Sequence, residues 1–100
     1  MALLFDWDED NKSKCEKRVP IADIEAVFAN PKTRKGSARQ EGGEQRWWAI
    51  DPDRKIFLIF AHRRIKVFAH RKIKTVLHIR VISARYMHDK ELEALWRRRR

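Results

Sequence analysis

The sequence predicts a small α+β fold, in which two N-terminal helices and one C-terminal helix accompany a small antiparallel β-sheet. Apolar residues between positions 21 and 28 recur at helical spacing, which is typical of an amphipathic helix. Apolar segments after position 46 alternate with polar residues and are separated by short turns, which favours strands. Because consecutive strands on short turns pair antiparallel, this order of elements indicates an α+β fold.

The N-terminal elements are predicted in the order strand, helix, helix. Leu3–Trp7 alternates apolar and polar residues and is predicted to be a strand. Residues 8–18 form a charged helix, with acids in its first turn and bases in its last, as the helix dipole favours. Pro20 suits the first turn of a second helix, Ile21–Ala29, which Asn30-Pro31 ends.

Residues 32–45 are polar and hold all three glycines, so we expect a mobile loop there. Arg46–Ile50 is the next predicted strand, and its adjacent Trp47 and Trp48 must point to opposite faces, so only one of them is core. A turn at Asp51-Pro52-Asp53 then leads into an apolar strand, Lys55–His62.

The last two predicted elements are a strand and a helix. In His78–Ala84, Ile79 and Val81 point inward while His78 and Arg80 point outward. Asp89 can cap the final helix, which ends in a basic tail, residues 97–100.

An eight-residue tandem repeat spans residues 59–74. Ile59–Lys66 is followed at once by the nearly identical Val67–Lys74. An even period preserves strand parity, so the repeat is predicted to lengthen a β-hairpin without turning its core face outward. The expected core face carries the mostly apolar odd-numbered residues, namely Phe57, Ile59, Ala61, Ile65, Val67, Ala69 and Ile73.

Composition excludes several classes of protein. A hydrophobic fraction of 43% argues against intrinsic disorder. Cys15 is the only cysteine, so an internal disulfide is excluded and a reducing compartment fits. The sequence offers neither a signal-peptide core nor a membrane span. We expect one cytoplasmic domain, residues 1–100, with no membrane contact.

The net charge of +10 lies in the second half of the chain. Between Arg54 and His88 there is no acid, while ten Lys and Arg occur there. Such a surface repels itself unless a polyanion covers it, and bases stack on aromatic rings interleaved with the charge. Nucleic acid is therefore favoured over a solubility face or a patch for an acidic protein. The predicted RNA-binding residues are Arg46, Arg64, Lys66, Lys72, Lys74, Phe60, Phe68 and Tyr86.

Four segments in this order resemble the BrnT toxins, the ribonuclease half of bacterial type II toxin–antitoxin pairs. They are residues 5–17, 21–28, 43–47 and 79–88, the last reading Ile-Arg-Val-Ile-Ser-Ala-Arg-Tyr-Met-His. The resemblance implies a RelE-like fold and a toxin that cleaves RNA without metal or other cofactor and so inhibits translation and growth. It also implies a BrnA-like ribbon-helix-helix antitoxin, with DNA bound only through the antitoxin complex.

RNA supplies its own nucleophile, the 2′-OH, so such a site needs charge stabilisation and acid–base help. The resemblance implies Arg80 and Arg85 as catalytic residues, with Arg63 or Arg71 from the facing strand. Lys17, Glu44 and His88 are further catalytic candidates. The histidine and cysteine spacings match no metal motif, so no metal site is predicted. The alternative function is a non-catalytic domain that keeps the fold and binds nucleic acid.

Overall fold

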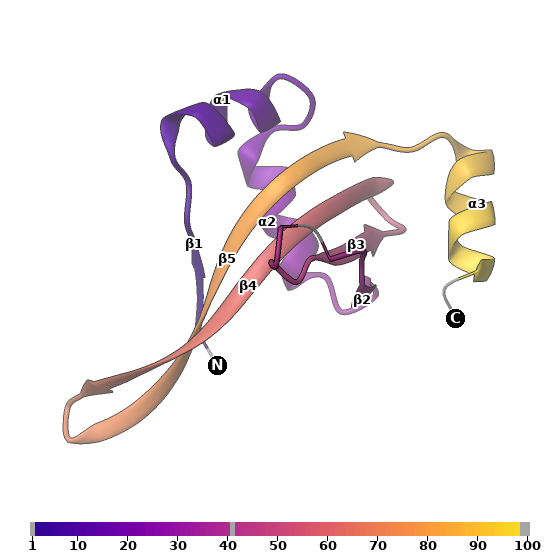
Figure 1. Cartoon of the computed structure of the whole chain (residues 1–100). Helices are drawn as coiled ribbons and strands as arrows, with labels where there is room; N and C mark the ends of the chain where they lie inside the picture. The colour runs from indigo at the N-terminus through magenta and orange to yellow at the C-terminus, as the bar shows by residue number, and fades with distance from the viewer. Residues whose placement is uncertain (1, 41, 99–100) are drawn as a thin grey trace.

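The computed structural model describes residues 2–40 and 42–98, and within them three helices accompany a five-stranded sheet (Figure 1). The strands lie in the order β1-β5-β4-β3-β2, and every neighbouring pair is antiparallel except β1 and β5. The predicted α+β class is confirmed. The elements are β1 Ala2–Phe5, α1 Glu9–Glu16, α2 Ile21–Ala29, β2 Arg34–Ser37, β3 Trp47–Asp51, β4 Ile56–Ala69, β5 Lys72–Tyr86 and α3 Asp89–Arg98.

Local sequence explains the first two helices. Asp8 caps α1, and its side chain accepts a hydrogen bond from the Asn11 backbone N–H at 2.7 Å. Cys15, on the inner side of α1, is buried as a small core residue. Pro20 precedes α2, whose bounds are those predicted.

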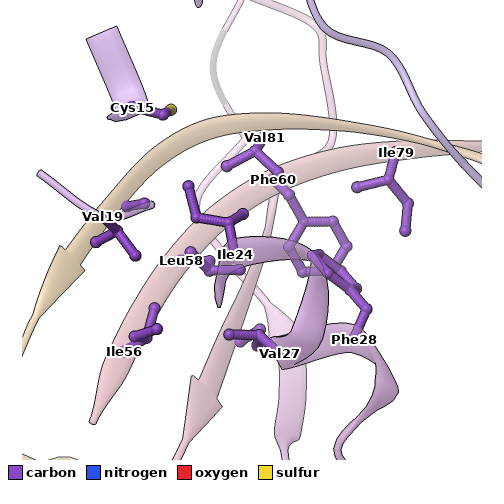
Figure 2. Packing of buried hydrophobic residues seen from close by; sticks show 12 residues of the cluster. Cys15, Val19, Ile24, Val27, Phe28, Ile56, Leu58, Phe60, Ile79 and Val81 are labelled. Atoms are coloured by element: carbon purple, nitrogen blue, oxygen red, sulfur yellow. The ribbon is translucent and has the colours of Figure 1, made fainter. Parts of the chain in front are cut away.

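The core lies between α2 and one face of the sheet. Figure 2 shows Ile24, Val27 and Phe28 of α2 directed toward side chains of β4 and β5. Phe28 and Phe60 meet edge to face, with ring centroids 4.9 Å apart. We call this the core face of the sheet, and the opposite side the second face.

The predicted parity of β4 is wrong. The buried side chains on the core face are the even-numbered Ile56, Leu58 and Phe60, whereas Phe57 and Ile59 lie on the second face. Residues 56–61 are apolar at odd and even positions alike, so the pattern could not choose the face that α2 covers.

A β-bulge in β5 brings two arginines to one face. Phe60 pairs with Val81 and Ile59 with Ser83, so Ile82 is an extra residue in β5. Arg80 is paired with Ala61 and Arg85 with Phe57. Since Ala61 and Phe57 share a face of β4, both arginines lie on the second face, although strict alternation along β5 would separate them.

The repeat lengthens the β4–β5 hairpin, as predicted. The hairpin extends well beyond the other strands, at the lower left of Figure 1. Residues 66–75 pair only with each other within the described chain, and we call them the ribbon. Val67 and Ile73 are exposed there, so the prediction that they continue the core is wrong, because none of the three helices that the structure describes covers this part of the hairpin.

The predicted loop 32–45 contains strand β2, which pairs with β3. Gly36 allows this pairing, since a Cβ at this position would lie 2.4 Å from Cζ2 of the Trp48 ring. Trp48 therefore packs on β2 at the second face while Trp47 packs against the core, as their alternation predicted. Residue 41 of this segment and residues 99–100 of the predicted tail lie outside the described residues.

Over residues 2–40 and 42–98, no helix combines the length and apolar character needed to cross a bilayer.

Candidate active site

A hollow of about 340 Å³ opens on the second face over β4 and β5, beside the residue that follows β1 and the segment before β3. The two arginines among its lining residues come from neighbouring strands, Arg63 from β4 and Arg80 from β5. We call it the arginine hollow. Its lining residues are Asp6, Glu44, Gln45, Ala61, His62, Arg63, His78 and Arg80.

Arg80 is held by Glu44. Both carboxylate oxygens of Glu44 accept hydrogen bonds from Nη2 of Arg80. Glu44 lies in the segment before β3, where the neighbouring Gln45 side chain donates to the Ala38 carbonyl at 3.3 Å. Arg80 and Glu44 remain 44% and 39% exposed, so this ion pair adds little stability but presents both charges to a ligand.

His78 and Asp6 belong to the hollow and were missed in the sequence. His78 precedes Arg80 by two residues on β5, so both project from the second face, and His78 pairs with Arg63 in register. Asp6 reaches the hollow because its backbone N–H donates to the Ile79 carbonyl at 2.8 Å. The i, i+2 spacing of His78 and Arg80 was the signal that could have identified the histidine.

The two candidate repeat arginines occupy different places. Arg63 lines the arginine hollow. Arg71 lies in the two-residue turn that closes the ribbon, with φ of +60°. The structure therefore brings Arg63, and not Arg71, together with Arg80.

Arg85 lies on the same face as Arg80 but is engaged by the C-terminal helix. Its Nη1 donates to Glu91 of α3 at 2.7 Å, and its guanidinium carbon lies 5.0 Å from the centre of the Phe57 ring. The hydrogen bond from Arg85 holds the pKa of Glu91 below its ordinary value. Arg85 is thus outside the arginine hollow and helps to fasten α3 to the sheet.

Lys17 and His88 are also placed outside the arginine hollow. Lys17 lines a second hollow of about 610 Å³ between the end of α1 and β5, where Lys14, Arg18 and Ser83 also lie. His88 is exposed between β5 and α3. Neither side chain lines the same hollow as Arg80.

The predicted RNA-binding residues divide into buried, partly buried and exposed sets. Phe60 is only 3% exposed, so the prediction that it stacks on a base is wrong: its ring packs on Phe28 in the core. Phe68 and Tyr86 are 73% and 49% exposed, so their rings remain accessible to solvent. The exposed cations are Arg64, Lys66, Lys72 and Lys74 of the hairpin, whereas Arg46 is half-buried 3.9 Å from a Glu44 oxygen.

His62 connects the hollow with the core face. Its ring stacks on Trp47 with centroids 4.8 Å apart. Burial first, and then the charges of Arg64 and Lys35, lower the pKa of His62 below its ordinary 6.5. Its imidazole is therefore protonated less readily than that of an ordinary histidine.

Among the residues that the structure describes, no three His, Cys, Asp or Glu side chains are grouped so that they could hold a metal ion. The polar side chains of the arginine hollow are instead suited to an anion, because two guanidinium groups meet there and arginine forks match phosphate oxygens. Two carboxylates, Asp6 and Glu44, and two imidazoles, His62 and His78, line the same hollow and could carry protons.

Comparison with known proteins assigns the chain to a family. The family model for BrnT, a ribonuclease toxin of a type II toxin–antitoxin system, matches residues 7–91, which is most of the chain and includes seven of the eight residues lining the arginine hollow. A search of curated proteins finds no match. The chain belongs to the BrnT family of ribonuclease toxins of type II toxin–antitoxin systems.

Proposed function

We propose that this chain is an active, metal-independent endoribonuclease and that it cuts RNA at the arginine hollow. The observation that carries the proposal is the meeting of Arg63 and Arg80, from adjacent strands, in one hollow with Glu44 and His78. Charge stabilisation by fixed donors is the largest contribution in many active sites, and here the sheet fixes the backbone of both arginines.

The chemistry needs no nucleophile from the protein. The ribose 2′-OH attacks the adjacent phosphorus, the P–O5′ bond breaks, and a 2′,3′-cyclic phosphate and a 5′-OH result. In this proposal Glu44 accepts the proton of the 2′-OH and His78 donates a proton to the leaving 5′ oxygen, and both side chains line the arginine hollow. Together these transfers balance protons without a cofactor.

Arg80 and Arg63 then stabilise the negative charge that grows on the phosphate oxygens. Both hydrogen bonds to Glu44 use Nη2 of Arg80, and a guanidinium also carries N–H donors on Nη1 and Nε. Arg80 can therefore bind a phosphate while Glu44 stays beside it as the base. The ion pair orients the guanidinium before the substrate arrives, which lowers the cost of reorganisation in the reaction.

Family membership supports a protein antitoxin as the partner of this chain. We propose a BrnA-like ribbon-helix-helix antitoxin that neutralises the toxin, with DNA bound only by the toxin–antitoxin complex. Free toxin would cut RNA, stop translation and arrest growth.

The test is cleavage of a labelled RNA by the purified chain in the presence of EDTA, compared with Arg80→Ala. Loss of one active-site donor is expected to lower kcat by about 10²–10³-fold. Lys12→Ala, which removes an exposed cation on α1, is the matched control and should cleave at the parental rate. Circular dichroism checks that each variant is folded.

Two results would contradict the proposal. RNA that binds to the folded parent but is never cut would support the alternative, a nucleic-acid-binding domain without catalysis. Equal loss of binding and turnover in Arg80→Ala would mean that Arg80 only anchors phosphate.

A further inference from the structure

The ribbon, residues 66–75, is a strongly cationic arm that projects from the sheet (Figure 1). Its charged side chains are Lys66, Arg71, Lys72 and Lys74, and the segment contains no acid. None of the four makes a salt bridge with any residue that the structure describes. The arm therefore carries uncompensated positive charge away from the body of the molecule.

Two of these lysines lie on the same face as the arginine hollow. Lys72 and Lys74 precede Arg80 on β5 by an even number of residues, and the bulge in β5 comes only after Arg80. At about 3.3 Å per strand residue, Lys74 lies about 20 Å and Lys72 about 26 Å from Arg80. Arg80, Lys74 and Lys72 thus share one face of β5 by strand parity, and we call these three cations the lysine track.

The ribbon has little to stabilise it in the free protein. A two-stranded hairpin is marginally stable in water, and like charges close together oppose its pairing further. The ribbon also leaves Phe68 and Ile73 more than 70% exposed, on the face opposite to the lysine track. A polyanion along the lysine track would remove the repulsion.

We propose that the lysine track binds the substrate RNA on one side of the cut and so sets a minimum length for efficient substrates. This inference rests on cleavage at the arginine hollow. Phosphates of a stacked strand are about 3.4 Å apart along its axis, so about six nucleotides separate Arg80 from Lys74 and about eight separate it from Lys72. The repeat thus supplies a substrate-length requirement that a hairpin without its second copy would lack.

The first experiment measures cleavage of RNAs that share one cut site and carry 2–12 nucleotides on either side. When the RNA on one side of the cut is lengthened beyond six to eight nucleotides, kcat/KM should rise about tenfold, and the change should appear in KM. Lengthening the RNA on the other side should have no such effect. Lys72→Ala/Lys74→Ala should remove this rise and leave short RNAs cleaved as before. Lys12→Ala/Lys90→Ala lowers the net charge equally outside the ribbon and should keep the rise.

A variant with a shortened ribbon tests whether the ribbon sets the required RNA length. Deleting residues 65–68 and 73–76 removes four residues from each strand, so the turn, the pairing of Ala69 with Lys72 and the facing of every remaining side chain are kept. Lys72 then lies four residues from Arg80, about 13 Å away. The required length should fall to about four nucleotides.

Binding of uncleavable 2′-O-methyl RNAs separates this inference from the proposed function. If the parent cuts nothing, the proposed function fails, but affinity should still rise with length, and Lys72→Ala/Lys74→Ala should flatten the salt dependence by about 1.4 in log–log slope. Affinity that does not depend on length overturns the inference. The inference is also overturned if Lys72→Ala/Lys74→Ala loses affinity for the antitoxin while its RNA binding is unchanged. That result would show that the ribbon binds an acidic protein segment.

Discussion

The two copies of the octapeptide have nearly the same sequence and different structures. They differ only by Ile59 against Val67 and by Arg64 against Lys72. The first copy, Ile59–Lys66, lies entirely within β4. The second copy, Val67–Lys74, contains the turn at the end of the hairpin, and its two halves pair with each other. Local propensity is the same in both, so tertiary neighbours decide what each copy becomes.

Those neighbours differ along the hairpin. The start of the first copy lies between β3 and β5 and under α2, and there Phe60 meets Phe28. The second copy has only itself to pair with among the described residues. Four predictions compare equivalent positions of the two copies.

The largest difference is expected for the phenylalanines. Phe60→Ala should lower the free energy of unfolding by about 3–5 kcal/mol, because it empties a space between α2 and the sheet. Phe68→Ala should change it by less than about 0.5 kcal/mol, because the ring is 73% exposed. Urea titration measures both, and a similar loss in the two variants would show that the ribbon packs on the body of the protein.

The arginines should differ in catalysis. Arg63→Ala removes a guanidinium from the arginine hollow and should lower kcat by about 10²–10³-fold. Arg71→Ala, at the turn, should stay within about twofold of the parent on a short RNA. A reversed order would assign the catalytic position to the second copy of the repeat.

The turn offers a third comparison. His70 and Arg71 both have positive φ, the backbone of a type I′ turn, which favours Asn-Gly. His70→Asn/Arg71→Gly should therefore stabilise the protein by about 0.5–1 kcal/mol. The equivalent His62→Asn/Arg63→Gly places glycine within a strand and should destabilise by at least about 0.5–1 kcal/mol, as thermal unfolding would show.

The smallest expected effect concerns pH. The pKa of His62 is lower in the folded chain than its ordinary 6.5, so the unfolded chain takes up the proton first as pH falls. The folded state should lose stability progressively below about pH 6.5. Asp89 and Glu91, whose pKa values are also lowered, affect stability only in more acid solution, since their ordinary values are 3.8 and 4.5. The free energy of unfolding, measured from pH 8 to pH 5, should depend less on pH in His62→Gln than in the matched variant His70→Gln. An equal pH dependence in the two variants would contradict this prediction.

Much of the candidate site was visible in the sequence, but its grouping was not. Arg80, Glu44 and Arg63 were identified as candidates, and the structure brings them into one hollow. The hollow does not include Arg85, which was predicted together with Arg80, or the further candidates Lys17 and His88, since residue type does not report which strands become neighbours. His78 was overlooked because a single histidine beside an arginine is a weak signal without the partner strand.

The sequence by itself determined the order of the elements other than β2, the bounds of α2, the inward side of β5 at Ile79 and Val81, and the hairpin that the repeat lengthens. Each of these follows from short-range periodicity, capping residues or an even repeat length. Only the tertiary structure decided which side of β4 is buried, since both sides are apolar and α2 covers one of them. It also decided that the bulge at Ile82 sets Arg80 and Arg85 on one face, because a bulge depends on how two strands pair and leaves no mark in either strand alone.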